Sequence, residues 1–177
     1  FESNCIVQHA LIQNIVNDMF YTHYRTKNCA ALAATQVDLR ECYPALSGIP
    51  AITVIDFTQD KNNPLCLINP VILSREGELP REYYDEGCMS VCSGDFHTIV
   101  PRDQRYQKIR VKAFVVEEFG NVSALEFGNI VDVQKGEWRE FDAQDFLSKC
   151  IAHEVDHLLG RLFIDLGGPV KRAQNLE

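Results

Sequence analysis

Apolar residues near the start of the chain recur with the period of an α-helix. Within residues 6–24 they stand three or four positions apart, at Leu11, Ile12, Ile15, Val16, Met19 and Phe20. This spacing places them on one side of a helix, where they can pack against a core. We therefore predict an N-terminal core helix over residues 6–24.

Shorter apolar segments in the middle of the chain have the character of β-strands. Residues 52–57 and 70–73 are rich in β-branched side chains and are bounded by Pro, Asn or Asp. Residues 109–116 alternate polar and apolar positions, and Gly120-Asn121 offers a turn before residues 122–127, which predicts a hairpin. We expect the middle of the chain to be mostly antiparallel β-structure.

A second helix is predicted over residues 143–159. Asp142 is a suitable N-cap and Gly160 a suitable terminator, and the apolar residues between them keep a helical spacing. Helix, strands and helix in this order indicate an α+β fold. At 177 residues, 46% of them hydrophobic, the chain is of the size that normally forms one domain, here residues 1–177.

Charge and hydropathy restrict the partners of the chain. Its 17 Lys and Arg against 25 Asp and Glu give a net charge of −8, which repels polyanions, so we expect no sequence-specific nucleic-acid ligand. The apolar runs are far shorter than the roughly 20 residues that cross a bilayer. The first residues also lack the charged and apolar regions of a secretory signal. We expect a cytoplasmic protein that makes no membrane contact.

The cysteines point to free thiols. They number seven and form no repeated C-x-x-C pair, which argues against a disulfide framework. Only Cys88 and Cys92 lie in a segment rich in turn residues, where a thiol can face a site.

The sequence His153-Glu154-Val155-Asp156-His157 is an H-E-x-x-H motif inside the second predicted helix. Residues i and i+4 of a helix project from one face, so both histidines can bind one metal ion, with Glu154 beside the open coordination position. The alternative is a surface helix with two solvated histidines. The apolar neighbours Phe146, Cys150, Ile151 and Leu158 favour the metal site.

Two histidines leave a tetrahedral metal ion in need of a third protein ligand. The segment Glu86-Gly87-Cys88-Met89-Ser90 offers a thiolate, which binds such ions strongly, beside a glycine that lets the backbone come close. Cys92 is a rival four residues further on. Spacing alone does not choose between the two thiols.

Three segments, in this order, resemble the signature motifs of peptide deformylases: residues 29–36, 86–90 and 153–157. Three further segments share the resemblance, namely residues 67–70, 100–102 and 158–165. The resemblance spans nearly the whole chain. It implies an α+β fold in which antiparallel sheets surround a central C-terminal helix that carries H-E-x-x-H, together with an N-terminal helix.

By this resemblance, Cys88, His153 and His157 hold one divalent metal ion and Glu154 is the catalytic carboxylate. A site of two histidines and one thiolate suits Fe(II) and Zn(II), and affinity alone favours zinc. The resemblance implies Fe(II) in the cell, with Zn(II) or Ni(II) acceptable in purified protein.

The resemblance also assigns residues to the substrate. The Gln36 amide and the Met89 N–H would bind the developing oxyanion, and Glu86 would contact Arg102. Methionine stands here in place of the usual leucine, but its backbone N–H can serve equally. The substrate-binding residues expected in this way are Ala30, Ala31, Glu86, Gly87 and Ile151.

The first motif departs from the family pattern. Cys29 and Ala31 stand where the family has glycines, so side chains occupy positions where substrate backbone should lie close. Cys92 replaces a proline after the second motif. These departures leave the metal ligands intact, but they put the substrate cleft in question.

The activity that the resemblance implies is removal of the N-formyl group from N-formylmethionyl peptides of newly made proteins, which releases formate. Its partners would be nascent peptides, met in a transient contact with the ribosome. Two alternatives remain. One is a silent paralogue that binds formylated peptides, suggested by Cys29 and Ala31. The other is a zinc peptidase, which would share the H-E-x-x-H motif and its water chemistry.

Overall fold

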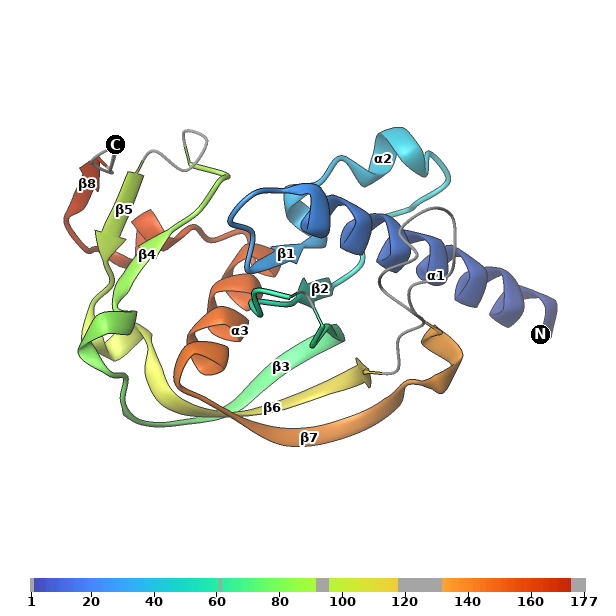
Figure 1. Ribbon diagram of the computed structural model, residues 1–177. Helices are drawn as coiled ribbons and strands as arrows, with labels where there is room; N and C mark the ends of the chain where they lie inside the picture. Colours follow the sequence, from blue (N-terminus) through green and yellow to red (C-terminus); the bar gives the residue numbers. More distant parts are fainter. Residues whose placement is uncertain (1, 61, 92–95, 118–131, 173–177) are drawn as a thin grey trace. The chain divides into compact units, whose positions relative to one another are not determined.

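The computed structural model describes residues 2–60, 62–91, 96–117 and 132–172, and it confirms the α+β fold (Figure 1). The chain divides into two compact units. Unit 1 comprises Phe1–Pro70 and Lys112–Arg139, and unit 2 comprises Val71–Val111 and Glu140–Glu177. Each unit is described by itself.

A five-stranded sheet has the order β1-β2-β3-β6-β7. Its strands are β1 (Ala31–Ala33), β2 (Ile52–Ile55), β3 (Leu65–Glu78), β6 (Tyr106–Val116) and β7 (Glu137–Gln144). The long strands β3, β6 and β7 each run from one unit into the other. The pairings of β1 with β2 and of β2 with β3 are antiparallel, as the sequence predicts.

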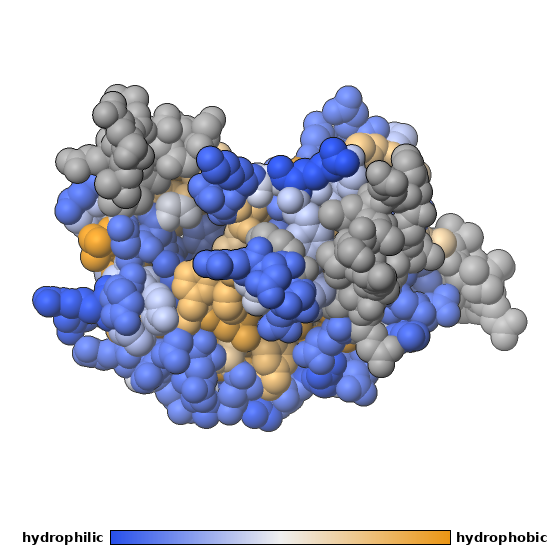
Figure 2. Space-filling model, viewed as in Figure 1, coloured by the Kyte–Doolittle hydropathy of each residue, from blue (hydrophilic) through white to orange (hydrophobic). Residues whose placement is uncertain are grey.

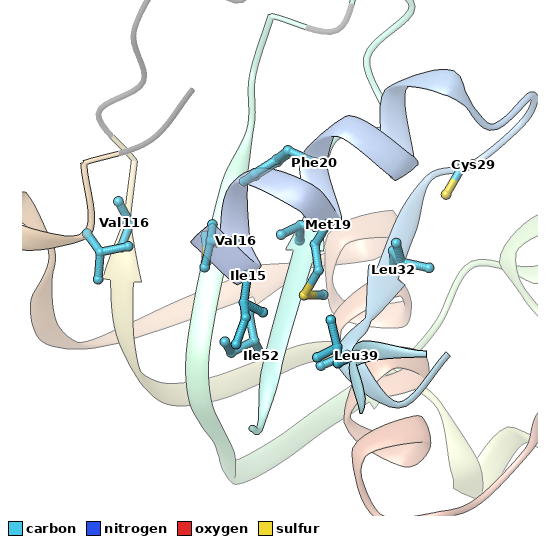
Figure 3. Packing of buried hydrophobic residues seen from close by; sticks show 13 residues of the cluster. Ile15, Val16, Met19, Phe20, Cys29, Leu32, Leu39, Ile52 and Val116 are labelled. Carbon is cyan, nitrogen blue, oxygen red and sulfur yellow. The ribbon is translucent and has the colours of Figure 1, made fainter. Parts of the chain in front are cut away.

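The core of unit 1 lies between α1 (Glu2–Arg25) and strand β2, whose four residues are all buried (Figure 3). Ile15, Val16, Met19 and Phe20 on α1 are at most 1% exposed, and these are the positions that the helical periodicity selects. The predicted helix over residues 6–24 is therefore confirmed, with a start at Glu2. Two shorter elements complete this part of unit 1: α2 (Leu39–Cys42) and the 3-10 turn η5 (Val133–Lys135).

Hydrogen bonds fasten the first motif to the end of α1. The Ala30 carbonyl accepts from the Asp56 N–H at 3.0 Å and lies 3.3 Å from His23 Nε2. Tyr24 Oη donates to the Asp56 carboxylate at 3.1 Å, which joins the same helix to the end of β2. The segment from Ala30 to the 3-10 turn η1 (Ala34–Gln36) is thus tied down at its start.

Cys29 belongs to the same hydrophobic core and is 4% exposed. Its thiol lies 3.1 Å from the Ala31 carbonyl oxygen. The side chain that replaces a family glycine therefore packs within unit 1. Ala31, at the second glycine position, is half-buried and pairs with Ile55 across the sheet.

Because Cys29 fills core volume, restoring the family residue with Cys29→Gly should destabilise the protein. We expect the free energy of unfolding to fall by about 1–2 kcal/mol, from the lost burial and the added backbone freedom of glycine. Urea unfolding measures the change, with Cys42→Ser at an exposed cysteine as the control. A Cys29→Gly protein as stable as its parent would contradict the core role.

Unit 2 contains a three-stranded antiparallel sheet of order β4-β5-β8 and the helix α3 (Asp145–Leu158). The strands are β4 (Asp85–Gly87), β5 (Phe96–Ile99) and β8 (Val170–Arg172). Among the described residues, unit 2 also has the 3-10 turns η2 (Arg81–Tyr83) before β4, η4 (Arg102–Gln104) after β5 and η6 (Phe163–Leu166) before β8. Two of the bonds between α3 and its neighbours come from its first turns: Ser148 Oγ donates to the Tyr106 carbonyl and Lys149 Nζ to the Asp85 carbonyl, both at 2.7 Å.

The predicted start of the second helix is wrong by two residues. Asp142 does not cap it but lies in β7, where it pairs with Lys108 at 2.9 Å and with Arg110 at 3.1 Å on β6. The helix begins at Asp145, after Gln144, whose side chain makes no capping bond. Cross-strand ion pairs, which local sequence does not reveal, thus hold Asp142 in the strand.

The strand predicted at residues 70–73 is also longer than expected. It is part of β3, which continues through Asn69 and Pro70 to Glu78. Asn69 adopts a φ of 53°, a left-handed conformation that asparagine tolerates, and neither Asn69 nor Pro70 ends the strand. Residues 109–116 lie in β6 as predicted, whereas residues 122–127, the other half of the expected hairpin, fall outside the described residues.

The surface carries both polar and apolar areas. Figure 2 shows a mainly hydrophilic face that an apolar area interrupts. Among the described residues, no helix combines the length and the hydropathy that crossing a membrane requires.

Candidate metal centre

The two histidines of the H-E-x-x-H motif lie together on α3, one turn apart. Their Nε2 atoms are 3.1 Å from each other and their ring centroids 4.7 Å apart. His157 is 5% exposed, and the ring of His153 stacks on Phe163. The alternative of two solvated histidines on a surface helix is therefore wrong.

A thiol completes the group. Cys88 directly follows β4, and its Sγ lies 3.2 Å from His157 Nε2. The ligand atoms of Cys88, His153 and His157 all lie within 4.8 Å of one another. The rival Cys92 lies outside the described residues, so the group rests on Cys88.

The electrostatics of the group favour a bound cation. Burial raises the pKa of Cys88, but hydrogen bonds with His153 and His157 outweigh it and lower this pKa to about 5. Burial lowers the pKa of His153, yet hydrogen bonds with Cys88 and Glu86 raise it to about 10. These shifts favour a thiolate at Cys88 and a positively charged ring at His153. A metal ion bound at these residues would balance the charge of the thiolate in place of protons.

Glu154 lies on the same helix and is 3% exposed. Among the described residues, its Oε2 has no hydrogen-bond partner. Burial raises the pKa of this carboxyl to about 7, although the charges of His153 and His157 oppose the rise. A buried carboxylate oxygen without a partner, beside two imidazoles and a thiol, fits a metal ion that carries a water molecule.

These residues fall within a match to a known family. The model of the family described as polypeptide deformylase matches residues 5–130 and 129–173. The chain belongs to the polypeptide deformylase family. Its resemblance to peptide deformylases, suggested by three short motifs, is thereby confirmed over most of the chain.

Individual deformylases are similar to this chain in sequence and in structure. The chain is 40% identical to peptide deformylase 1 of Coxiella burnetii over 163 residues, which cover 92% of this chain and 77% of the relative. A deformylase structure from Legionella pneumophila is similar with a TM-score of 0.55 and 27% identity, over 89% of this chain and 72% of that one. A deformylase from Synechococcus elongatus in complex with actinonin gives 0.52 and 28%, over 83% and 59%.

The remaining residues assigned by the deformylase motifs lie in both units. In unit 1, Gln36 Oε1 accepts a hydrogen bond from the Ala33 N–H at 2.8 Å, and Ala30 is half-buried. In unit 2, Met89 is 43% exposed and Ile151 is fully buried. Gly87 is exposed at the end of β4. Their contacts with substrate stay predictions.

The contact expected between Glu86 and Arg102 is wrong. The partner of Glu86 is Arg105, which binds both carboxylate oxygens, at 2.6 and 3.1 Å. Arg102 instead pairs with Glu78 at the surface. The glutamate of the second motif therefore has the arginine contact that the family implies, but it comes from a different residue.

Sequence reasoning missed two residues beside the metal ligands. Arg105 and Asp156 form an ion pair at 2.9 Å, with side chains 3% and 14% exposed. Asp156 occupies a variable position of H-E-x-x-H, and Arg105 lies three residues after the arginine that the family resemblance selected. No local pattern distinguishes these two arginines.

Proposed function

We propose that this chain is a metal-dependent hydrolase that removes the N-formyl group from N-formylmethionyl peptides of newly made proteins, releasing formate. The observation that carries the proposal is the compact group of Cys88, His153 and His157 beside Glu154, within a chain of the deformylase family. The group combines a thiolate and two imidazoles, a ligand set suited to a catalytic metal with an open position.

In this proposal Cys88, His153 and His157 hold one divalent ion. Such an ion would lower the pKa of a bound water molecule and would polarise the formyl carbonyl. Glu154 takes the proton of that water and later returns it to the leaving amine. The burial of Glu154 keeps competing solvent away from the proton transfer, which strengthens the electrostatic interactions within the site.

Two donors would hold the charge that develops on the formyl oxygen: the Gln36 side chain and the Met89 N–H. The hydrogen bond from the Ala33 N–H to Gln36 Oε1 orients this amide, and its other end, Nε2, is a donor. Gln36 belongs to unit 1 and the metal ligands to unit 2. We propose that residues 1–177 act as one catalytic domain, as the sequence predicts.

The substrate contacts proposed are those of the motif residues Ala30, Ala31, Glu86, Gly87 and Ile151. The core position of Cys29 supports an active enzyme, because this thiol is not available to obstruct a peptide. The buried position of Cys29 removes one of the two observations that suggested a silent paralogue. The other reason, Ala31, is a single methyl group on a half-buried residue.

The ion proposed for the cell is Fe(II), with Zn(II) or Ni(II) acceptable in purified protein. Two histidines and a thiolate suit all three ions, and affinity alone would favour zinc over iron. A reducing cytoplasm, where nascent chains emerge, would protect both the ferrous ion and the Cys88 thiolate. Contact with the ribosome would be transient, since the net charge of −8 opposes tight binding to RNA.

The test is formate release from formyl-Met-Ala-Ser by protein purified anaerobically with Fe(II). We expect formate in stoichiometric excess over enzyme, no release after chelation, and recovery when Fe(II) is restored. Metal analysis of the same preparation checks the identity of the ion. Actinonin, which is bound in the Synechococcus elongatus structure, should inhibit the release.

The alternatives give different products. A zinc peptidase would release new peptide fragments and no formate. A protein that binds one metal ion per chain but releases no formate from several formyl peptides would contradict the proposal and support the silent paralogue.

A further inference from the structure

Three polar side chains lie where α1 meets the first motif, and neither the metal centre nor the proposed mechanism uses them. His23 is 0% exposed, Asp56 is 1% exposed and Tyr24 is half-buried. The ring centroids of His23 and Tyr24 are 5.2 Å apart, and both rings stack on Phe20. Buried polar groups cost free energy unless they form hydrogen bonds. The partners of these side chains therefore show what the cluster holds in place.

The hydrogen bonds of the cluster converge on the Ala30 carbonyl. His23 Nε2 lies 3.3 Å from this oxygen and, because a carbonyl only accepts, must donate to it. The Asp56 N–H donates to the same oxygen at 3.0 Å. The Asp56 carboxylate is itself held by Tyr24 Oη at 3.1 Å and by two backbone N–H groups of the following loop, at 3.1 and 3.3 Å. Helix α1 thus reaches the Ala30 carbonyl by two routes, directly through His23 and through Tyr24 and Asp56.

The direction of this carbonyl decides which backbone groups of β1 face outward. Strand β1 stands at the end of its sheet, so among the described strands only β2 pairs with it. In an antiparallel pair, residues alternate between bonding the neighbouring strand and facing away from it. Since Ala30 bonds toward β2, the backbone groups of Ala31 and Ala33 face the free edge. The Ala33 N–H agrees, because it donates to Gln36 Oε1. Ala31 is thus the residue whose backbone an extended peptide can meet.

We propose that His23 and Tyr24 are positioning residues for peptide binding, which hold the Ala30 carbonyl toward β2 and so present the backbone of Ala31 to the formyl peptide. The inference rests on the proposed function in that β1 binds this peptide. Ala31 carries a methyl group where the family has glycine, so a displaced strand would have less room to accommodate a substrate. Because neither side chain carries the proton of the reaction, their loss weakens binding and leaves the chemical step unchanged.

The test compares Tyr24→Phe with Tyr43→Phe. The first keeps the ring and its stacking but removes the hydrogen bond to Asp56. The second is a matched control, because Tyr43 Oη donates to Asp18 on α1, so this variant also loses a tyrosine–aspartate bond to that helix, away from the first motif. Formate release from formyl-Met-Ala-Ser gives kcat and KM. We expect Tyr24→Phe to raise KM about 3–10-fold, the effect of one lost hydrogen bond, with kcat unchanged. Tyr43→Phe should match the parent in both constants.

A second variant, His23→Met, tests the direct route. Methionine fills a similar volume in the core but cannot donate to the Ala30 carbonyl, so KM should rise here too, again without a change in kcat. Circular dichroism and urea unfolding check the fold of each variant, and if Tyr24→Phe does not fold, His23→Met decides. Parent-like KM values in the folded variants would overturn the proposal. A fall in kcat at constant KM would do the same, and so would an equal rise of KM in Tyr43→Phe.

A binding measurement separates this proposal from the proposed function. Isothermal titration of formyl-Met-Ala-Ser into metal-loaded Glu154→Gln protein gives a Kd that does not depend on hydrolysis, and adding Tyr24→Phe should raise this Kd by the same factor as KM. If the peptide binds but the parent protein releases no formate, the deformylase proposal fails while the Kd comparison still decides the role of Tyr24. If the peptide does not bind at all, both proposals are wrong.

Discussion

Replacing Glu154 with glutamine is expected to lower formate release by about 10²–10⁴-fold while the metal ion stays bound. The substitution keeps the size of a side chain that is 3% exposed, so packing around α3 should be preserved. An amide, however, cannot take a proton from water or return it to the leaving amine. General acid–base catalysis contributes about 10²–10⁴-fold to rates, and we expect turnover to fall by this factor.

The measurement combines formate release with metal analysis on the same preparation. Glu137→Gln, at a carboxylate whose side chain is 69% exposed, is the matched control and should behave like the parent. Turnover within a few-fold of the parent would show that Glu154 is not the proton carrier. Loss of the metal ion together with activity would instead make Glu154 part of the binding site.

The relation between sequence and fold differs from element to element. The periodicity of Ile15, Met19 and their neighbours predicts α1 because helix geometry is local, and the residues it selects are the buried ones. The start of α3 cannot be predicted in the same way. Asp142 has the propensity of an N-cap, but the cations of Lys108 and Arg110 hold it in β7 from more than thirty residues away.

The same distinction applies to the site. His153, Glu154 and His157 are predictable because three to four residues of helix define their spacing. The prediction of Cys88 as the third ligand depended on the family motif, because Cys92 fits the spacing equally well. The arginine partner of Glu86 was predicted wrongly because Arg102 and Arg105 differ only in how the chain turns through η4, where Arg102 faces the surface and Arg105 is buried.

Replacing Cys88 with serine should remove the metal ion. Serine is nearly isosteric, so the buried site should keep its shape, but a neutral hydroxyl replaces the thiolate that divalent transition metals prefer. Loss of a supporting residue alone costs about 10–100-fold in metal affinity, so loss of a direct ligand should cost more than about 100-fold. Formate release should fall to background at metal concentrations that saturate the parent protein.

Competition with a chelator measures the affinity, and Cys42→Ser, at an exposed cysteine, is the control that should leave it unchanged. The thiolate charge-transfer absorption of the Co(II) protein should vanish in the Cys88 variant. If that absorption persists in Cys88→Ser, another thiol binds the metal, and Cys92, the rival in the sequence, becomes the candidate. If affinity and absorption are lost while Cys42→Ser matches the parent, Cys88 is the thiolate ligand, and the family motif has identified the right thiol.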